Sequence, residues 1–189
     1  MPPLLARRPQ TPKQTPMRPL LPLLLAVMLS ACAKPAWMRS APPDFSDWFD
    51  SQNSIVVQEA ARANTCGTPG GESVVSLMRD LPSMQAWSAN RGIALVSLNG
   101  KPFPEGPYAI VEFGQRPNSG YGIAVSRMAG AKDGDLMLKA TFFEPIPGRW
   151  SEAEVSSPCV IVALPAAEYS RVRLIDQTGL VRADTEGAP

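Results

Sequence analysis

The sequence contains no histidine, and this absence excludes more functions than any other feature of its composition. Histidine is the commonest catalytic base near neutral pH and the commonest metal ligand. A Ser-His-Asp or Cys-His catalytic site and a histidine-rich zinc site are therefore excluded. A hydrolase with a Ser-Lys or paired-carboxylate site stays open. Its candidate lysines are Lys101 and Lys139, although neither forms a recognisable motif with a serine.

A long apolar run is missing as well. The best candidate, residues 20–29, is apolar except for Pro22, whereas a membrane-spanning helix needs roughly 20 apolar residues. The run has the length of the apolar region of a secretory signal peptide, which is typically ~7–15 residues, and it follows a basic segment. We therefore interpret the first part of the chain as a targeting segment.

The apolar run ends in "LSAC" at residues 29–32, which resembles the lipobox of bacterial lipoproteins. In that motif, small residues precede the cleaved bond and the cysteine thiol carries the diacylglycerol. The resemblance implies a lipoprotein signal peptide over residues 1–31, with Met17 as an alternative start, and lipidation of Cys32. Ala33, not Asp, follows the cysteine, which implies the outer membrane, facing the periplasm. The two or three acyl chains of a lipoprotein anchor it stably.

Acidic residues are absent before Cys32, and four of the 18 basic residues lie there. The chain from Cys32 onward holds the other 14 basic residues and all 17 acidic ones, a net charge of −3. A nucleic-acid-binding protein shows a basic patch or stripe, and this part of the chain has no such excess. We therefore expect no nucleic-acid partner, and the ordinary composition favours one globular domain.

Residues 32–54 are interpreted as a tether between the lipid and the domain, because three prolines make the first half stiff and extended. The aromatic residues of the second half either insert into the bilayer interface or dock on the domain. Docking is favoured, since anionic lipid would repel the intervening aspartates. The prolines are Pro35, Pro42 and Pro43, the aromatic residues Phe45, Trp48 and Phe49, and the aspartates Asp44, Asp47 and Asp50.

Residues 55–182 are predicted to form a mainly β domain: an antiparallel β-sandwich or small barrel of about 7–8 strands with one or two short helices. A helix is predicted over residues 81–92, capped by Ser83 and ended by Gly92. Residues 183–189 are predicted to be a disordered tail. The predicted strands lie at or near residues 54–60, 73–79, 93–98, 107–114, 121–128, 135–143, 159–165 and 171–184.

Two strand predictions are the most specific. "YGIAVSRM" and "DLMLKATFF" flank "AGAKDG", in which Asp133-Gly134 is typical of a two-residue hairpin turn. The segment "CVIVALP", residues 159–165, is short, β-branched and nearly all apolar. It indicates a central strand covered on both faces.

With Cys32 acylated, Cys66 and Cys159 remain, and an exported chain meets an oxidising compartment. We expect these two cysteines, 93 residues apart, to form a disulfide. Chain entropy alone would make such a bond worth about 4–5 kcal/mol. Two buried free thiols are the alternative.

The segment from about Glu72 to Leu174 resembles the C-terminal domain of the protease-complex subunit PrcB family. The matching pieces are "QRPNSGYGIAV" at 115–125, "EPIPG" at 144–148, "SSPCVIVALP" at 156–165 and the upstream "VVSLMRDLPSMQAW". Their order and spacing carry the resemblance. Cys159 stands where the family more commonly has an aromatic residue, which makes the disulfide a local feature of this chain.

The founding member of the family takes part in assembling a surface protease complex whose protease is a separate chain. The resemblance therefore implies a non-enzymatic accessory or protein-binding role without a cofactor. The partner would be an envelope protein, with a protease complex as one option. A small-ligand-binding β-barrel is the alternative besides the hydrolase. The motif residues are expected to be architectural, since glycine permits close backbone approach and proline shapes loops: Gly120, Tyr121, Gly122, Pro145, Pro158 and Pro165.

Replacing Cys32 tests the lipid anchor directly. Cys32→Ser removes the thiol that would carry the lipid, so we expect an unprocessed chain that no longer partitions with membranes. Intact-mass measurement and membrane fractionation check this. Unchanged mass processing together with unchanged membrane partitioning would show that the chain is not a lipoprotein.

Overall fold

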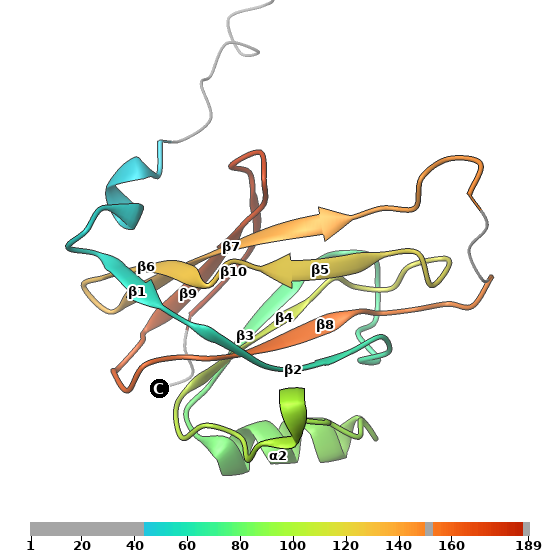
Figure 1. The fold of residues 1–189 in the computed structure, drawn as a ribbon, viewed down its shortest axis with the longest axis horizontal. Coiled ribbons are helices and arrows are strands. Elements are labelled where there is room, and N and C mark those ends of the chain that lie inside the picture. Colours follow the sequence, from blue (N-terminus) through green and yellow to red (C-terminus); the bar gives the residue numbers. More distant parts are fainter. Residues whose placement is uncertain (1–43, 150–152, 187–189) are drawn as a thin grey trace, which may run out of the picture. The chain divides into compact units, whose positions relative to one another are not determined.

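Two β-sheets and one α-helix make up the part of the chain that the computed structural model describes, residues 44–149 and 153–186 (Figure 1). Short 3-10 turns precede β1 and follow the helix. The elements are η2 (Ser46–Phe49), β1 (Ser54–Val56), β2 (Gln58–Ala63), β3 (Val74–Met78), α2 (Leu81–Asn90), η3 (Leu98–Gly100), β4 (Tyr108–Glu112), β5 (Gly122–Val125), β6 (Met128–Lys132), β7 (Asp135–Phe143), β8 (Cys159–Ala163), β9 (Arg171–Ile175) and β10 (Val181–Glu186).

The first sheet has six strands in the order β1-β6-β7-β9-β10, with β5 also paired to β7. The second has four strands in the order β2-β8-β4-β3. Figure 1 shows the two sheets as layers, with α2 against the outer face of the second. The mainly β prediction and its sandwich alternative are confirmed. The barrel alternative is wrong for the described residues, because the two sheets do not close on each other.

The predicted antiparallel arrangement is correct for all pairs but one, since β7 and β9 are parallel. The intervening strand, β8, lies in the second sheet. The chain therefore re-enters the first sheet at β9, which runs in the same direction as β7. Ten strands replace the predicted seven or eight. The predicted strands at 54–60 and 171–184 each divide into two, β6 forms mostly from a predicted loop, and the strand predicted at 93–98 is not formed.

The central strand β8 is buried along its whole length, as predicted. Val160 and Val162 belong to the apolar core between the sheets, and Ile161 and Ala163 to a second core beneath α2. A strand with an apolar layer on each face has no solvent-facing side, which explains its nearly uninterrupted apolar sequence.

The predicted strand over residues 54–60 divides at Val57. Before this residue, β1 pairs with β6 in the first sheet; after it, β2 pairs with β8 in the second. The Val57 N–H donates to the Arg127 carbonyl at 2.8 Å, and no bridge joins β2 to β5 beyond it. The chain thus passes from the first sheet to the second at Val57. Beyond this residue, β2 and β5 diverge.

The predicted hairpin turn is present, with positive φ at Asp133 and Gly134, as a type I′ turn requires. Part of the predicted loop "AGAKDG" is instead strand β6. From the Val125–Ala140 pair to the Gly130–Met137 pair, the chain advances five residues on one side and three on the other. This irregularity bends the hairpin arm and separates β5 from β6.

The predicted helix is present but its cap differs. Asp80 is the N-cap, and its carboxylate accepts from the Ser83 N–H at 2.8 Å while the Ser83 hydroxyl accepts from the Asp80 N–H at 3.2 Å. Asp and Ser are equally good caps, and here they share a capping box. Gly92 follows the helix with positive φ, as predicted.

The strand predicted over residues 93–98 is wrong. The alternation of half-buried and exposed residues is real, and Leu95 packs on the core beneath α2. The only bridge recorded for this segment joins Ser97 to Ala61. Periodicity reports which side of an extended chain is buried, not whether a neighbouring strand pairs with it.

The C-terminal end of the described domain differs from the prediction, whereas the N-terminal end agrees with the favoured docking of the aromatic segment. β10 extends to Glu186, so residues 183–186 are strand where a disordered tail was predicted; residues 187–189 lie outside the described residues. At the other end, η2 docks on the domain. The Lys139 ammonium lies 3.9 Å from the centre of the Phe49 ring, and the Trp48 backbone lies against Gly130.

Gly130 is the residue that permits this docking. A Cβ at this position would lie 2.4 Å from the Trp48 carbonyl oxygen, so Gly130→Ala should displace η2 and lower the free energy of unfolding by about 1–3 kcal/mol. Denaturant unfolding measures the change. Gly122→Ala is the matched control, because its Cβ would meet only the Phe143 ring at 3.8 Å. Equal stability of the two variants would contradict the docking.

Candidate functional site

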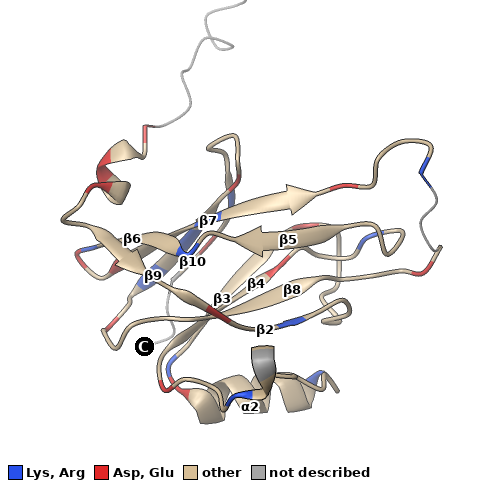
Figure 2. Ribbon diagram, in the orientation of Figure 1, with Lys and Arg blue, Asp and Glu red and all other residues tan. Residues whose placement is uncertain are grey.

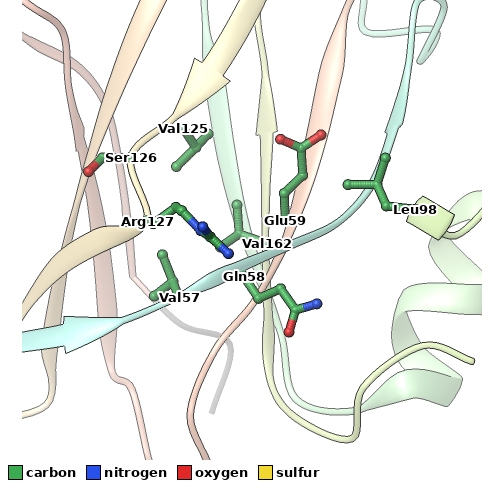
Figure 3. A pocket seen from close by; sticks show the side chains of 8 residues that line it. All are labelled: Val57, Gln58, Glu59, Leu98, Val125, Ser126, Arg127 and Val162. Carbon is green, nitrogen blue, oxygen red and sulfur yellow. The ribbon is translucent and has the colours of Figure 1, made fainter. Parts of the chain in front are cut away.

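A groove opens where β2 and β5 diverge, and we call it the fork groove (Figure 3). Its volume is about 230 Å³. The β2 side is formed by the chain just after the break, and the β5 side by the chain at the bend before β6. Val162 of the central strand contributes between them, and Leu98 of η3 lies at the rim. The lining residues are Val57, Gln58, Glu59, Leu98, Val125, Ser126, Arg127 and Val162.

The floor of the fork groove is apolar and its rim carries opposite charges. Val57 and Val162 are buried, and Figure 2 shows no charged residue on β5 or β8. On the rim, Glu59 is paired with Arg62 through two hydrogen bonds of 2.5 and 2.7 Å. Arg127 is exposed and forms no ion pair with a carboxylate in the described part of the chain. The groove therefore combines an apolar floor with an uncompensated cation.

Most of the predicted motif residues meet at one end of the sandwich. A Cβ on Gly120 would lie 2.9 Å from Cβ of Pro145, so the two loops touch. The Tyr121 ring meets the Phe113 ring edge-on, with centroids 5.9 Å apart. Pro158 lies beside the same end, since its carbonyl accepts from the Phe113 N–H at 2.8 Å. These contacts are packing contacts between loops.

Of the other two motif residues, Gly122 directly follows Tyr121 and Pro165 lies beyond the far end of β8. Gly122 starts β5 and pairs with Phe143. Pro165 follows the opposite end of β8, and its carbonyl accepts from the Tyr169 hydroxyl at 3.2 Å. The structure therefore brings together the glycine, tyrosine and proline loops of the motif but not Pro165.

Sequence reasoning missed the arginine that lies among these rings. The Arg116 guanidinium lies 3.9 Å from the Phe113 centroid and 5.9 Å from that of Tyr121. Burial, and then the charge of Arg182, lower the pKa of Arg116. The only available signal was its place in "QRPNSGYG", five residues before the tyrosine. Stacking of this kind holds a loop against an aromatic core.

The predicted disulfide between Cys66 and Cys159 is present, with the two Cα atoms 6.0 Å apart. Both cysteines are buried. The Ser157 hydroxyl oxygen accepts from the N–H groups of Cys66 and Gly67 at 2.8 and 2.9 Å. The bond and these contacts fasten the loop of residues 64–73 to the start of β8.

A buried ionic cluster beside the disulfide was not predicted. Glu112 is 0% exposed, and one of its carboxylate oxygens accepts from the Thr68 hydroxyl and from the Arg91 guanidinium. Arg91 also donates to the Cys66 carbonyl at 3.2 Å and lies over the Trp87 ring. The cluster ties α2, β4 and the disulfide-bonded loop together. The sequence alone places Glu112 only as one position in the strand predicted over residues 107–114.

Several predicted features have no described geometry. Cys32, the signal peptide and most of the tether lie outside the described residues. No helix in residues 44–149 and 153–186 is long and apolar enough to cross a membrane. In the same ranges, no three Cys, Asp or Glu side chains are grouped so that they could hold a metal ion. Lys139 stacks on Phe49, and Lys101 borders a hollow next to the fork groove.

The fold and these contacts define a class: a two-sheet β domain with one covering helix and a disulfide-fastened loop. Residues 108–165 match the family described as PrcB C-terminal, so the chain carries a PrcB C-terminal domain over these residues. The match covers less than a third of the 189 residues and runs from β4 through β8. It is shorter than the resemblance over 72–174 and leaves out "VVSLMRDLPSMQAW". No curated protein and no solved structure matches the chain.

Removing one partner of the Arg91–Glu112 ion pair should destabilise the protein more than replacing both partners by apolar residues. Arg91→Met leaves a buried carboxylate without its cation, and breaking such a pair costs about 3–5 kcal/mol of unfolding free energy. We expect the lower end of this range, because the Arg91 side chain is 30% exposed. Adding Glu112→Leu should restore part of the loss. Denaturant unfolding of the single and double variants measures both effects.

The control is the exposed pair of Arg62 and Glu59. Arg62→Met should cost no more than ~1 kcal/mol, as is usual for surface ion pairs. If Arg91→Met were no more destabilising than Arg62→Met, the buried cluster would not fasten the helix to the sheet.

Proposed function

We propose that this protein is a non-enzymatic, lipid-anchored envelope protein whose β domain binds another envelope protein in the fork groove. The observation that carries the proposal is the apolar floor of that groove between two diverging strands. The "LSAC" motif supports the lipid anchor, and Ala33 supports the outer membrane facing the periplasm. The PrcB C-terminal domain supports a protease complex as the partner's setting.

The size and surroundings of the groove favour a protein partner over a small molecule. Its volume of about 230 Å³ is below the roughly 300–1,000 Å³ of typical small-ligand pockets. Apolar side chains continue onto the surface next to it. Val56 and Met128, which are cross-strand partners, are 68% and 44% exposed, and Leu98 is 38% exposed. Exposed apolar residues around a groove with a polar rim are typical of protein interfaces.

Site-specific photo-crosslinking in the native envelope tests this function. We replace Gln58 or Leu98, which line the groove, by benzoyl-phenylalanine in the full chain and expect an adduct of the same defined mass from both positions. Lys132, exposed in the β6–β7 hairpin, is the control position, and no adduct of that mass is expected there. Absence of an adduct at the groove, or equal yield at Lys132, would overturn the proposal.

A further inference from the structure

The edge of β5 that faces the fork groove has no pairing strand in the described part of the chain. β5 pairs with β7 alone. The Ser126 N–H donates to the Lys139 carbonyl at 2.8 Å, and N–H groups in an antiparallel pair alternate in direction along the strand. The N–H and C=O groups of Ile123 and Val125 therefore point away from β7. This edge offers peptide donors and acceptors that β7 cannot reach.

Beside β6, the edge position of the first sheet is occupied by β1. Beside β5, the same edge position has no strand, because the chain has moved to the second sheet. β1 pairs with β6 as far as Val57, whose N–H reaches Arg127. Beyond Val57, β2 turns to β8 in the second sheet. A strand added along the free edge of β5 would therefore continue the line of β1 within the first sheet. Such an edge is recognised by the backbone of an extended peptide, through main-chain hydrogen bonds.

The positive charge of Arg127 at the groove favours an incoming segment that carries a negative charge. Arg62 already engages Glu59 with two hydrogen bonds. Arg127 is exposed and lies next to the last paired position, and the described residues supply it with no carboxylate. An acidic residue near one end of the added strand would form an ion pair with Arg127.

We propose that an extended segment of the partner protein enters the fork groove, pairs with the free edge of β5 as an added strand, and places a carboxylate beside Arg127. This proposal rests on the proposed function and names its binding mode. The partner is a separate protein and not a second copy, because a second copy would have to bring its own β2, which flanks its own β5, into the same groove.

Val125→Pro tests the strand addition without removing a β7 hydrogen bond. Proline lacks only the N–H that points away from β7, a position where edge strands tolerate it. Val125→Thr is the matched control, since it keeps the N–H and a β-branched side chain. With the photo-crosslinker at Leu98, we expect Val125→Pro to lower the adduct yield about tenfold, as the loss of one main-chain bond predicts, and Val125→Thr to leave it unchanged.

Arg127 is tested in the same way. Arg127→Glu should lower the adduct yield, by repulsion of the partner's carboxylate, and Arg127→Lys should retain most of it. Thermal unfolding of each variant without partner controls for stability. If Val125→Pro proves unstable, amide hydrogen exchange replaces it: the amides of Ile123 and Val125 should exchange at least about tenfold more slowly in the Leu98 adduct than in the free protein, as new backbone hydrogen bonds require.

The outcomes separate the two proposals. Equal adduct yields from stable Val125→Pro and Val125→Thr proteins, or unchanged exchange of the two amides, would overturn strand addition while groove docking stands. An adduct with twice the mass of the protein would replace the partner by a second copy. No adduct from the unmodified groove would overturn the proposed function itself.

Discussion

Burial of β8 on both faces is the constraint on which the other elements depend. A strand with apolar side chains on each face needs an apolar layer above and below it, and here these layers are the first sheet and α2. It also needs hydrogen-bonding neighbours on both edges, which are β2 and β4. Because β2 supplies one of these edges, the chain must leave β6 at Val57. The fork groove is the direct consequence of that departure.

The disulfide and buried polar interactions hold the segment between β2 and β3 in place. The segment between β2 and β3 has no regular structure, yet a disulfide, a serine hydroxyl and a buried carboxylate hold it at three points. Buried polar groups are costly unless they are paired, so Glu112 requires Arg91 and thereby fixes the end of α2 against the sheet. The covalent and ionic contacts lie side by side, since Glu112 and Cys159 are register partners on β4 and β8.

The PrcB C-terminal match spans strands of both sheets but not all of either one. It includes β5, which presents the unpaired edge, and β8, which forms the floor of the groove. It excludes β2 and η3, which form the opposite wall. In the proposed strand addition, the backbone of β5 inside the match would supply the hydrogen bonds, and the wall formed by β2 and η3 lies outside the match. Backbone hydrogen bonds carry no side-chain specificity, so the wall and Arg127 are where specificity for a partner would reside.

The sequence by itself determined the elements whose signals are local. Asp133-Gly134 specified its turn through positive φ angles, the run from Cys159 to Ala163 specified a buried strand, and the helix over residues 81–90 was found with only its cap misassigned. The disulfide followed from the cysteine count together with the expectation that the chain is exported.

Only the tertiary structure decided the features that depend on distant partners. Periodicity gave no sign that the run at 54–60 would change sheets, that 93–98 would find no ladder, or that 183–186 would pair with β9. It also gave no sign of the ion pair between Arg91 and Glu112, two residues from separate elements. The fork groove belongs to this second group, because it lies between strands far apart in the sequence. Side-chain pattern specifies which face of a segment is buried, whereas backbone pairing is decided by whichever strand the folded chain brings alongside.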